Sequence, residues 1–337
     1  MSELSPRKQR ILEAVIVEYV QAGEPVASDV IVRKYELGVR GATVRSEMAE
    51  ITELGLLDKP YSSAGRVPSD GGYRYYVDQI VVPKPPTQPE KKHIGEATSE
   101  EDTLNDFLSS TARALSRITH LLSVATVNRN QDARVRHLLI TGLSPGKCLL
   151  VMVMENGHVE NRMVETPPET GLAHIAAVNE ALATACIGKS LRELGTLSVP
   201  KGLDKLATAV GAATIHQVKS AAKELQNGKL VAEGHEFVLA QPEFLREEGA
   251  AREVLDGIED EEAIRSALSR PSLSIGSENP DRRFRRLTVI QSPFKVGGQE
   301  TGVLALIGPT RLEYDRAISL LDFTAKALGA ALDDLTA

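Results

Sequence analysis

The sequence predicts an α+β protein with a winged helix-turn-helix near its N-terminus. Residues 40–76 combine a short amphipathic helix, a tight glycine-bearing hairpin and an aromatic-rich helix, which is the order of elements in a winged helix. Beyond residue 130, apolar runs of strand length alternate with helical, alanine-rich stretches. That alternation is typical of an α+β domain.

Length and composition allow two or three domains and a sizeable core. The chain has 337 residues, of which 42% are hydrophobic and 25% charged. Its net charge is −7, and residues 1–82 hold 10 Lys and Arg against 12 Asp and Glu. Any contact with DNA must therefore come from a local cluster of cations. Without a signal-peptide h-region or a bilayer-length apolar run, the sequence predicts a cytoplasmic protein with no membrane partner.

Three helices are expected before the hairpin. The first begins at Ser5, with Pro6 at the first helical position, and ends at Gly23. The second begins at Ser28 and is followed by a turn over 37–41. The third spans about 42–54 and buries an apolar stripe of helical spacing, namely Val44, Met48, Ile51 and Leu54.

The opposite face of the third helix is the candidate surface for reading DNA. It combines short polar side chains with arginines near the helix start: Arg40, Thr43, Arg45, Ser46 and Glu47. This combination is typical of a recognition helix in the major groove. The alternative is an ordinary solvated helix face.

The hairpin is the candidate wing. It starts at Leu56 and Leu57, has Gly65 and Arg66 near its tip, and closes at Pro68. We expect four residues to contact the DNA backbone, namely Lys59, Ser62, Ser63 and Arg66. An Arg66→Ala change should then weaken binding at all sequences and flatten its salt dependence. An ordinary hairpin is the alternative.

The remaining elements follow from composition and periodicity. Tyr73, Tyr76, Val77 and Ile80 have the spacing of a core stripe on one helix. Four prolines between 83 and 89 argue for extended backbone and against a helix, so 83–101 is expected to be a linker. Helices are expected over 104–127, 168–226 and 250–270, and after a cap at Thr310. Strands are expected over 135–143, 147–154, 158–166, 272–277, 285–294 and 302–308, with a turn at 156–158.

No catalytic, cofactor or metal site is expected. Cys148 and Cys186 lie in apolar settings, and no histidine pair has metal-ligand spacing. The G-x-S-x-G match around Ser144 leads into a strand, which predicts a β-turn instead of a nucleophile elbow. GGQETG, 297–302, is interpreted as a hairpin turn. Arg311 and Thr310 could hold an anion, but a structural arginine and a simple helix cap are favoured.

Four blocks of this chain resemble the heat-inducible transcription repressor HrcA family. Two are N-terminal, LSPRKQRILEAVIVEYVQAGEPVAS and ATVRSEMAEITELGLLDKPYSSAGRVPSDGGYRYYVDQI, and two are C-terminal, IGSEN and GVLALIGPTRLEYDRAISLL. The chain departs from the family at Arg40 and Gly41, where small hydroxyl residues are usual. It also departs at Tyr61, where histidine is common.

The resemblance implies a domain plan and a function. The plan is a winged helix over 1–82, a linker over 83–101, a GAF-like domain over 102–167 and 230–337, and an inserted dimerising α/β segment over 168–229. The implied function is negative regulation of chaperone operons of the groE and dnaK type, as a dimer on the inverted-repeat CIRCE operator and under modulation by the GroEL chaperonin. The alternatives are a regulator with a small-molecule effector in the GAF-like domain and, least favoured, a hydrolase at Ser144.

Overall fold

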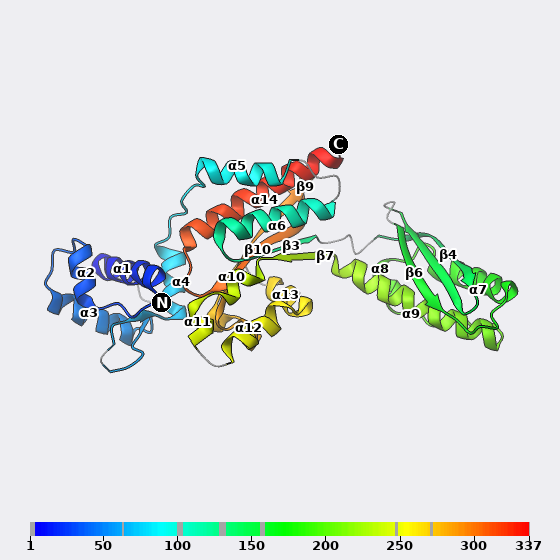
Figure 1. Ribbon diagram of the computed structural model, residues 1–337, viewed down its shortest axis with the longest axis horizontal. Coiled ribbons are helices and arrows are strands. Elements are labelled where there is room, and N and C mark those ends of the chain that lie inside the picture. The colour runs from blue at the N-terminus through cyan, green and yellow to red at the C-terminus, as the bar shows by residue number, and fades with distance from the viewer. Residues whose placement is uncertain are drawn as a thin grey trace. The chain divides into compact units, whose positions relative to one another are not determined.

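Figure 1 shows the computed structural model of the chain, and the structure describes residues 4–62, 64–99, 104–127, 133–155, 159–246, 249–269 and 272–336. Helices and strands are mixed along the chain, which confirms the α+β class. By packing, the chain divides into two compact units. One unit comprises Met1–Thr126 and Leu230–Ala337, and the other is Val127–Lys229, an insertion between two strands of the first.

The first unit opens with a head of four helices and a short hairpin. Its elements are α1 (Pro6–Ala22), α2 (Ser28–Lys34), α3 (Gly41–Glu53), β1 (Leu57–Asp58), β2 (Val67–Pro68) and α4 (Asp70–Gln79). Ser5 caps α1 by accepting a hydrogen bond from the backbone N–H of Lys8, and Gly23 ends the helix with φ 66°. These elements confirm the helix and hairpin predictions for residues 5–79.

The helices of the head bury apolar side chains between them. Val44, Met48 and Ile51 of α3 are buried, as predicted, whereas Leu54 is 48% exposed. Tyr73 and Tyr76 of α4 are buried, which confirms their assignment to the core. Each fully buried aliphatic or aromatic side chain of this kind contributes about 1.5–3 kcal/mol to folding, so the head has substantial packing energy.

The prediction that the proline-rich segment excludes a helix is wrong. Helix α5 (Gln88–Ala97) follows Thr87, and Glu90 closes a capping box with Thr87. Pro89 lies in the first turn, where the missing N–H has no partner to lose. Only the stretch before Thr87, over 81–86, lies outside any helix or strand.

A five-stranded sheet forms the body of the first unit. Its strand order is β7 (Lys229–Glu233), β3 (Leu122–Val127), β10 (Gln299–Pro309), β9 (Leu287–Val296) and β8 (Leu273–Ile275). Strands β9 and β10 pair antiparallel, with Val289 opposite Ile307. Their connection at Gly297–Gly298 confirms the hairpin turn predicted there.

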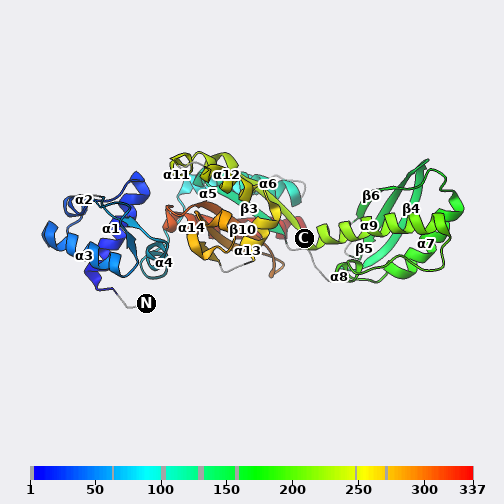
Figure 2. The same ribbon diagram turned by 90° about the horizontal axis from the view of Figure 1, so that it is seen from below.

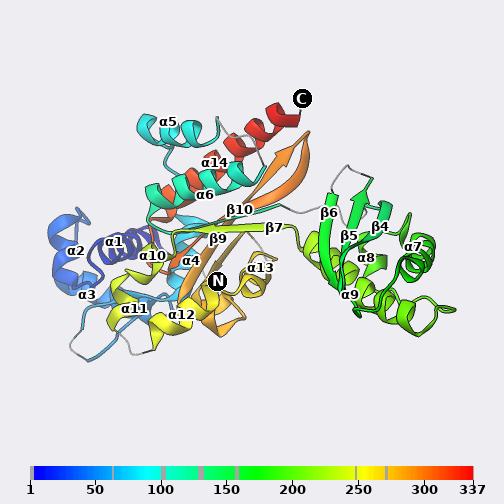
Figure 3. The ribbon, with the colours of Figure 1, turned by 45° about the vertical axis from the view of Figure 1, so that its right-hand side comes forward.

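Helices cover both faces of this sheet (Figure 3). One face packs against α6 (Leu104–Thr119) and α14 (Tyr314–Thr336). The other shares a core with α10 (His235–Leu239), α11 (Pro242–Arg246), α12 (Ala250–Ile258) and α13 (Glu261–Leu268). Two 3-10 turns, η1 (Gly276–Glu278) and η2 (Arg282–Phe284), follow β8.

Two boundary predictions in the body are corrected. The helix expected over 104–127 ends at Thr119, because the buried run after it forms strand β3. Thr310 does not cap the last helix, which begins at Tyr314. The carbonyl oxygen of Thr310 instead accepts a hydrogen bond from the Tyr314 hydroxyl at 2.7 Å.

The second unit is a three-stranded antiparallel sheet with helices on one face. Strands β4 (Val135–Ser144), β5 (Lys147–Met154) and β6 (Val159–Glu165) confirm the three strands predicted there. The turn predicted at 156–158 lies outside the described residues. Helices α7 (Leu172–Cys186), α8 (Leu191–Leu194) and α9 (Lys205–Asn227) cover the inner face (Figure 2).

This sheet moves the predicted boundary of the insertion. Residues 135–165 were assigned to the GAF-like part, but their inward side chains share one core with α7 and α9. Leu150 and Met152, for example, are buried among these helices. The compact unit therefore begins at Val127, not at residue 168.

The outer face of the same sheet carries exposed and half-buried apolar side chains within this unit, with Thr141 and Asn161 among them. In register, Leu139 lies opposite Val151, and Leu149 lies opposite Met163. Leu139 and Met163 are 53% and 50% exposed. We call this surface the outer sheet face, and its apolar residues are Leu139, Leu149, Val151, Val153, Val159 and Met163.

Candidate nucleic-acid interface

The start of α3 presents exposed cations. Arg40 is the N-cap residue, with extended backbone and no capping hydrogen bond from its side chain. Arg45 and Ser46 are exposed, and Thr43 is half-buried. Among the described residues, the guanidinium groups of Arg40 and Arg45 form no hydrogen bond or ion pair. Both positive charges therefore face solvent without a neutralising partner.

Glu47 does not share this exposed face, although the sequence analysis placed it there. Its carboxylate is buried and binds the guanidinium of Arg7, with Nε–O distances of 2.8 and 3.0 Å. The hydrogen bond and charge of Glu47 raise the pKa of Arg7. Lys8 holds Glu50 in the same way at 2.7 Å. Cations of α1 thus neutralise two carboxylates of α3 and leave the arginines at its start unopposed.

The hairpin supplies a third exposed cation. Lys59 follows β1, and both Lys59 and Ser62 are exposed. In the described part of the chain, the Lys59 ammonium has no ion pair. Ser63, also expected to contact DNA, lies outside the described residues.

Arg66 lies at the base of the hairpin, so the prediction that places it near the tip is wrong. Its backbone pairs with Val26 ahead of α2, with N–O distances of 2.8 and 2.9 Å. Its Nε donates to Thr52 Oγ1 at 2.9 Å. The half-buried guanidinium thus fastens the hairpin to the last turn of α3, and it must leave Thr52 to reach a phosphate.

A hollow of about 410 Å³ brings four of the eight predicted contacts together. It lies between α3 and the hairpin and is lined by Arg45, Lys59, Ser62 and Arg66. Arg40, Thr43 and Ser46 lie at the start of α3 but do not line it. The sequence alone missed Ser28 and the backbone of Val26, which close the other side. No spacing pattern marks these two residues, because only tertiary pairing with Arg66 brings them there.

The other chemical motifs are structural. Ser144 ends β4 and pairs with Lys147 across the Pro145–Gly146 turn, which confirms the β-turn interpretation. Cys148 and Cys186 are buried, and burial raises the pKa of Cys186 to about 11. Within the described ranges, no group of three or more His, Cys, Asp or Glu could hold a metal ion. Across those same ranges, no helix combines the length and apolarity needed to cross a bilayer.

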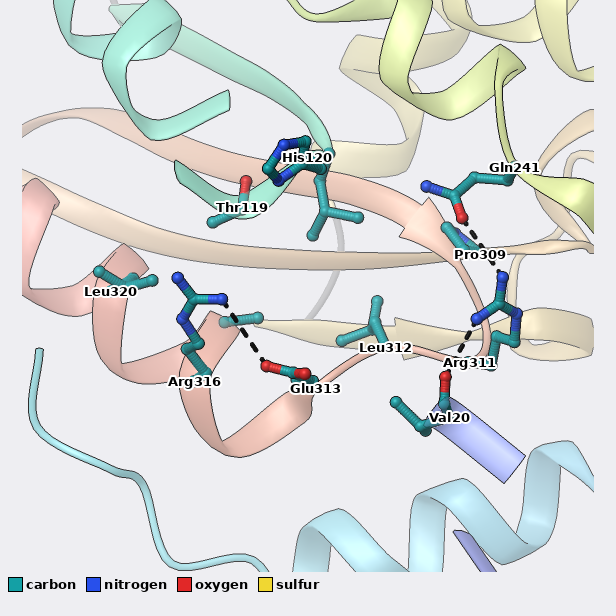
Figure 4. Close-up of a pocket in the computed structure, with 12 residues that line it drawn as sticks. Val20, Thr119, His120, Gln241, Pro309, Arg311, Leu312, Glu313, Arg316 and Leu320 are labelled. Atoms are coloured by element: carbon teal, nitrogen blue, oxygen red, sulfur yellow. Dashed lines mark hydrogen bonds and ion pairs between the residues drawn. The ribbon is translucent and has the colours of Figure 1, made fainter. Parts of the chain in front are cut away.

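A second hollow, of about 260 Å³, lies beside α14 and the end of α1 (Figure 4). Arg311 points across it and donates to the Val20 carbonyl oxygen at 3.1 Å. The same guanidinium pairs with Glu243 at 3.0 Å. Arg316 is likewise paired, with Glu90 and Glu313. These partners confirm the interpretation of Arg311 as a structural residue and leave its charge neutralised.

Comparison with known proteins decides the family. A family model described as the HrcA protein C terminal domain matches residues 105–318. The chain is 34% identical to the heat-inducible transcription repressor HrcA of Symbiobacterium thermophilum, over 96% of this chain and 98% of that protein. The chain belongs to the HrcA family. Its HrcA relative from Moorella thermoacetica is 33% identical over 98% of this chain and 99% of that protein.

A solved structure shares the HrcA fold of this chain. It is the crystal structure of a hypothetical protein at 2.2 Å resolution, with a TM-score of 0.58 and 18% identity over 98% of both chains. At that identity the likeness shows the fold alone. The family membership confirms the resemblance that the N-terminal and C-terminal sequence blocks indicated.

Proposed function

We propose that this chain represses chaperone operons by binding an inverted-repeat CIRCE operator through its head. In this proposal residues 4–80 are a winged helix-turn-helix, α3 lies in the major groove and the β1–β2 hairpin contacts the neighbouring backbone. Arg40, Thr43, Arg45 and Ser46 reach base edges or nearby phosphates. The observation that carries the proposal is that Arg40 and Arg45 at the start of α3 have no ion-pair partner among the described residues, with Arg45 and Lys59 lining one hollow, on a chain of net charge −7.

The body and the insertion complete the proposal. The five-stranded body is a GAF-like domain, and the insertion over 127–229 is the dimerising segment. Its outer sheet face supports a homodimer, because exposed apolar side chains gathered on one face are typical of an interface between protein chains. A two-fold dimer matches an inverted repeat, since protein and site then share one axis. GroEL maintains the active form, and the protein works in the cytoplasm without acting as an enzyme.

Footprinting on the upstream region of a chaperonin operon tests this function, with and without GroEL. The wild-type chain should protect both arms of the inverted repeat. Arg45→Ala should weaken that protection and reduce discrimination against altered bases by about 1–3 kcal/mol. Glu53→Ala, an exposed change at the far end of α3, is the control and should leave discrimination unchanged. Absence of any protected repeat with the wild-type chain would remove the proposal.

The salt dependence of binding separates the two hairpin cations. Affinity falls as salt concentration rises, and Lys59→Ala should make this fall less steep. The magnitude of the slope of log affinity against log salt should decrease by about 1, because one phosphate contact is lost. Arg66→Ala should change the slope less, because its guanidinium is engaged with Thr52. This revises the expectation from sequence that Arg66 acts chiefly on phosphate. Equal and large changes in both variants would show that Arg66 leaves Thr52 on DNA.

The rival function is a regulator with a small-molecule effector in the GAF-like body. A hollow of about 330 Å³, where the start of α14 in the body meets α1, α4 and the segment before α5, is the observation that favours it. A thermal-shift screen of metabolites discriminates the two functions, since a ligand that binds only the folded protein raises its melting temperature. A metabolite that also changed operator affinity would favour the rival.

A further inference from the structure

An ion-paired contact joins α4 of the head to the turn after β8 of the body. The Arg74 guanidinium binds Glu278 with two parallel hydrogen bonds, Nε to Oε1 at 2.9 Å and Nη2 to Oε2 at 2.5 Å. Its Nη2 also donates to the Leu273 carbonyl oxygen at 3.0 Å. Two parallel bonds between a guanidinium and a carboxylate fix direction as well as distance.

Asp70 makes a second contact to the same turn. One carboxylate oxygen accepts the backbone N–H of Ser277 at 2.7 Å. The carboxylate also lies 2.2–2.3 Å from the place that a Cβ on residue 276 would occupy. Gly276 has φ 52°, so both the backbone angle and the approach of Asp70 require glycine there. We call Asp70 and Arg74 with Gly276, Ser277 and Glu278 the latch.

Among the described residues, the head also meets the body through an aromatic pair and through Arg311. The Tyr73 ring packs against Tyr314 with centroids 5.7 Å apart, and both side chains are buried. Arg311 holds the carbonyl oxygen of Val20 near the end of α1 (Figure 4). Three separate contacts, on α4 and α1, restrain rotation of the head in a way that one contact could not.

The latch is poorly suited to a role in stability alone. The side chains of Arg74 and Glu278 are 25% and 35% exposed, so solvent screening reduces what the pair contributes to folding, whereas its bidentate geometry still fixes direction. Tyr75 and Tyr76 already fasten α4 within the core of the head. The latch fixes the direction of α4 relative to the body. Because α3 packs in the same head as α4, the latch also fixes the direction of α3.

We infer that the latch residues are positioning residues that set the distance between the two recognition helices of the dimer. This inference rests on the proposed function. A head held in one orientation on each body restricts the half-site spacings that the dimer accepts, because groove positions repeat every helical turn of DNA. A released head would reach several spacings, each with reduced affinity, because its orientation must then be fixed on binding.

Charge reversal in the full-length chain tests the inference. Arg74→Glu and Glu278→Arg each place like charges together, and the double variant restores opposite charges. The assay compares affinity for operators whose half-site spacing is natural or changed by one to five base pairs. We expect each single reversal to reduce discrimination among spacings about tenfold, and the double reversal to recover most of it. We expect this recovery to be partial. The Arg74→Glu carboxylate faces Asp78, and it cannot donate the hydrogen bond that Arg74 gives to the Leu273 carbonyl oxygen.

A matched control and the possible outcomes keep the test decisive. Arg113 and Glu233 form an ion pair of the body outside the latch, so Arg113→Glu should leave spacing preference unchanged. Unchanged spacing preference in folded single variants would overturn the inference. Uniform loss of affinity at every spacing, without recovery in the double variant, would also overturn it by showing a purely structural contact. Failure of the wild-type chain to bind any spacing would instead overturn the proposed function.

Discussion

If the outer sheet face forms the proposed dimer, a Val151→Asp change there should yield monomers and weaken operator binding about 100-fold. Val151 lies on the central strand of that face, opposite Leu139 and Asn161. A carboxylate buried in an apolar interface without a partner opposes association strongly. Each head would then bind its half-site alone and lose the gain, of about 10²–10⁴, that linked binding provides.

Sedimentation and operator titration together check this expectation. Lys201→Asp introduces the same side chain in an exposed loop of the insertion and should leave both measurements unchanged. A Val151→Asp chain that remained dimeric would exclude the outer sheet face as the interface. A monomer that bound the operator as tightly as the wild-type dimer would show that dimerisation is not needed for binding.

A Gly72→Ala change should destabilise the head by about 3 kcal/mol and weaken operator binding. A Cβ on residue 72 would lie 2.0 Å from the Leu56 carbonyl oxygen and 3.0 Å from its carbon. Backbone cannot yield as a flexible side chain can, so α4 must move away from the hairpin. A loss of this size is a large share of the stability of a small domain, and it lowers the folded fraction of heads.

Gly71→Ala is the control for this change on the neighbouring residue. Its Cβ would lie 3.2 Å from the Gly55 carbonyl oxygen and 3.7 Å from Ser69 Oγ, and Gly71 is exposed. We expect an effect within about 1 kcal/mol, since alanine also favours the helix. Amide hydrogen exchange of α4 in both variants, with operator titration, measures the difference. Equal protection of α4 in the two variants would contradict the expected clash.

The head could be predicted from sequence because its signals are local. Ser5, Pro6 and Gly23 mark the ends of α1 through their own backbone chemistry. The helix-period stripe of Val44, Met48 and Ile51 likewise gives the inward face of α3. Local rules also explain the error at α5, where prolines were counted as breakers although Pro89 sits in the first turn.

Side-chain pairing across the chain could not be predicted from the same patterns. Glu47 has the spacing of a surface residue, yet Arg7, which lies 40 residues away, draws it inward. The sequence around Arg66 predicts a residue near the tip of the hairpin. Its pairing with Val26 and Thr52 instead places it at the base of the hairpin. The latch joins residues about 200 positions apart. Sequence therefore predicted which residue types surround the interface, but not which of them are already engaged.

The pairing of α1 cations with α3 carboxylates bears on how such a repressor searches a chromosome. Arg7 and Lys8 form ion pairs with Glu47 and Glu50, so these two cations are less available to bind DNA of arbitrary sequence. Weak attachment to arbitrary sequence lowers competition from the very many non-cognate sites of a genome. A small number of molecules can then keep their targets occupied, and a modest fall in their active number frees those targets.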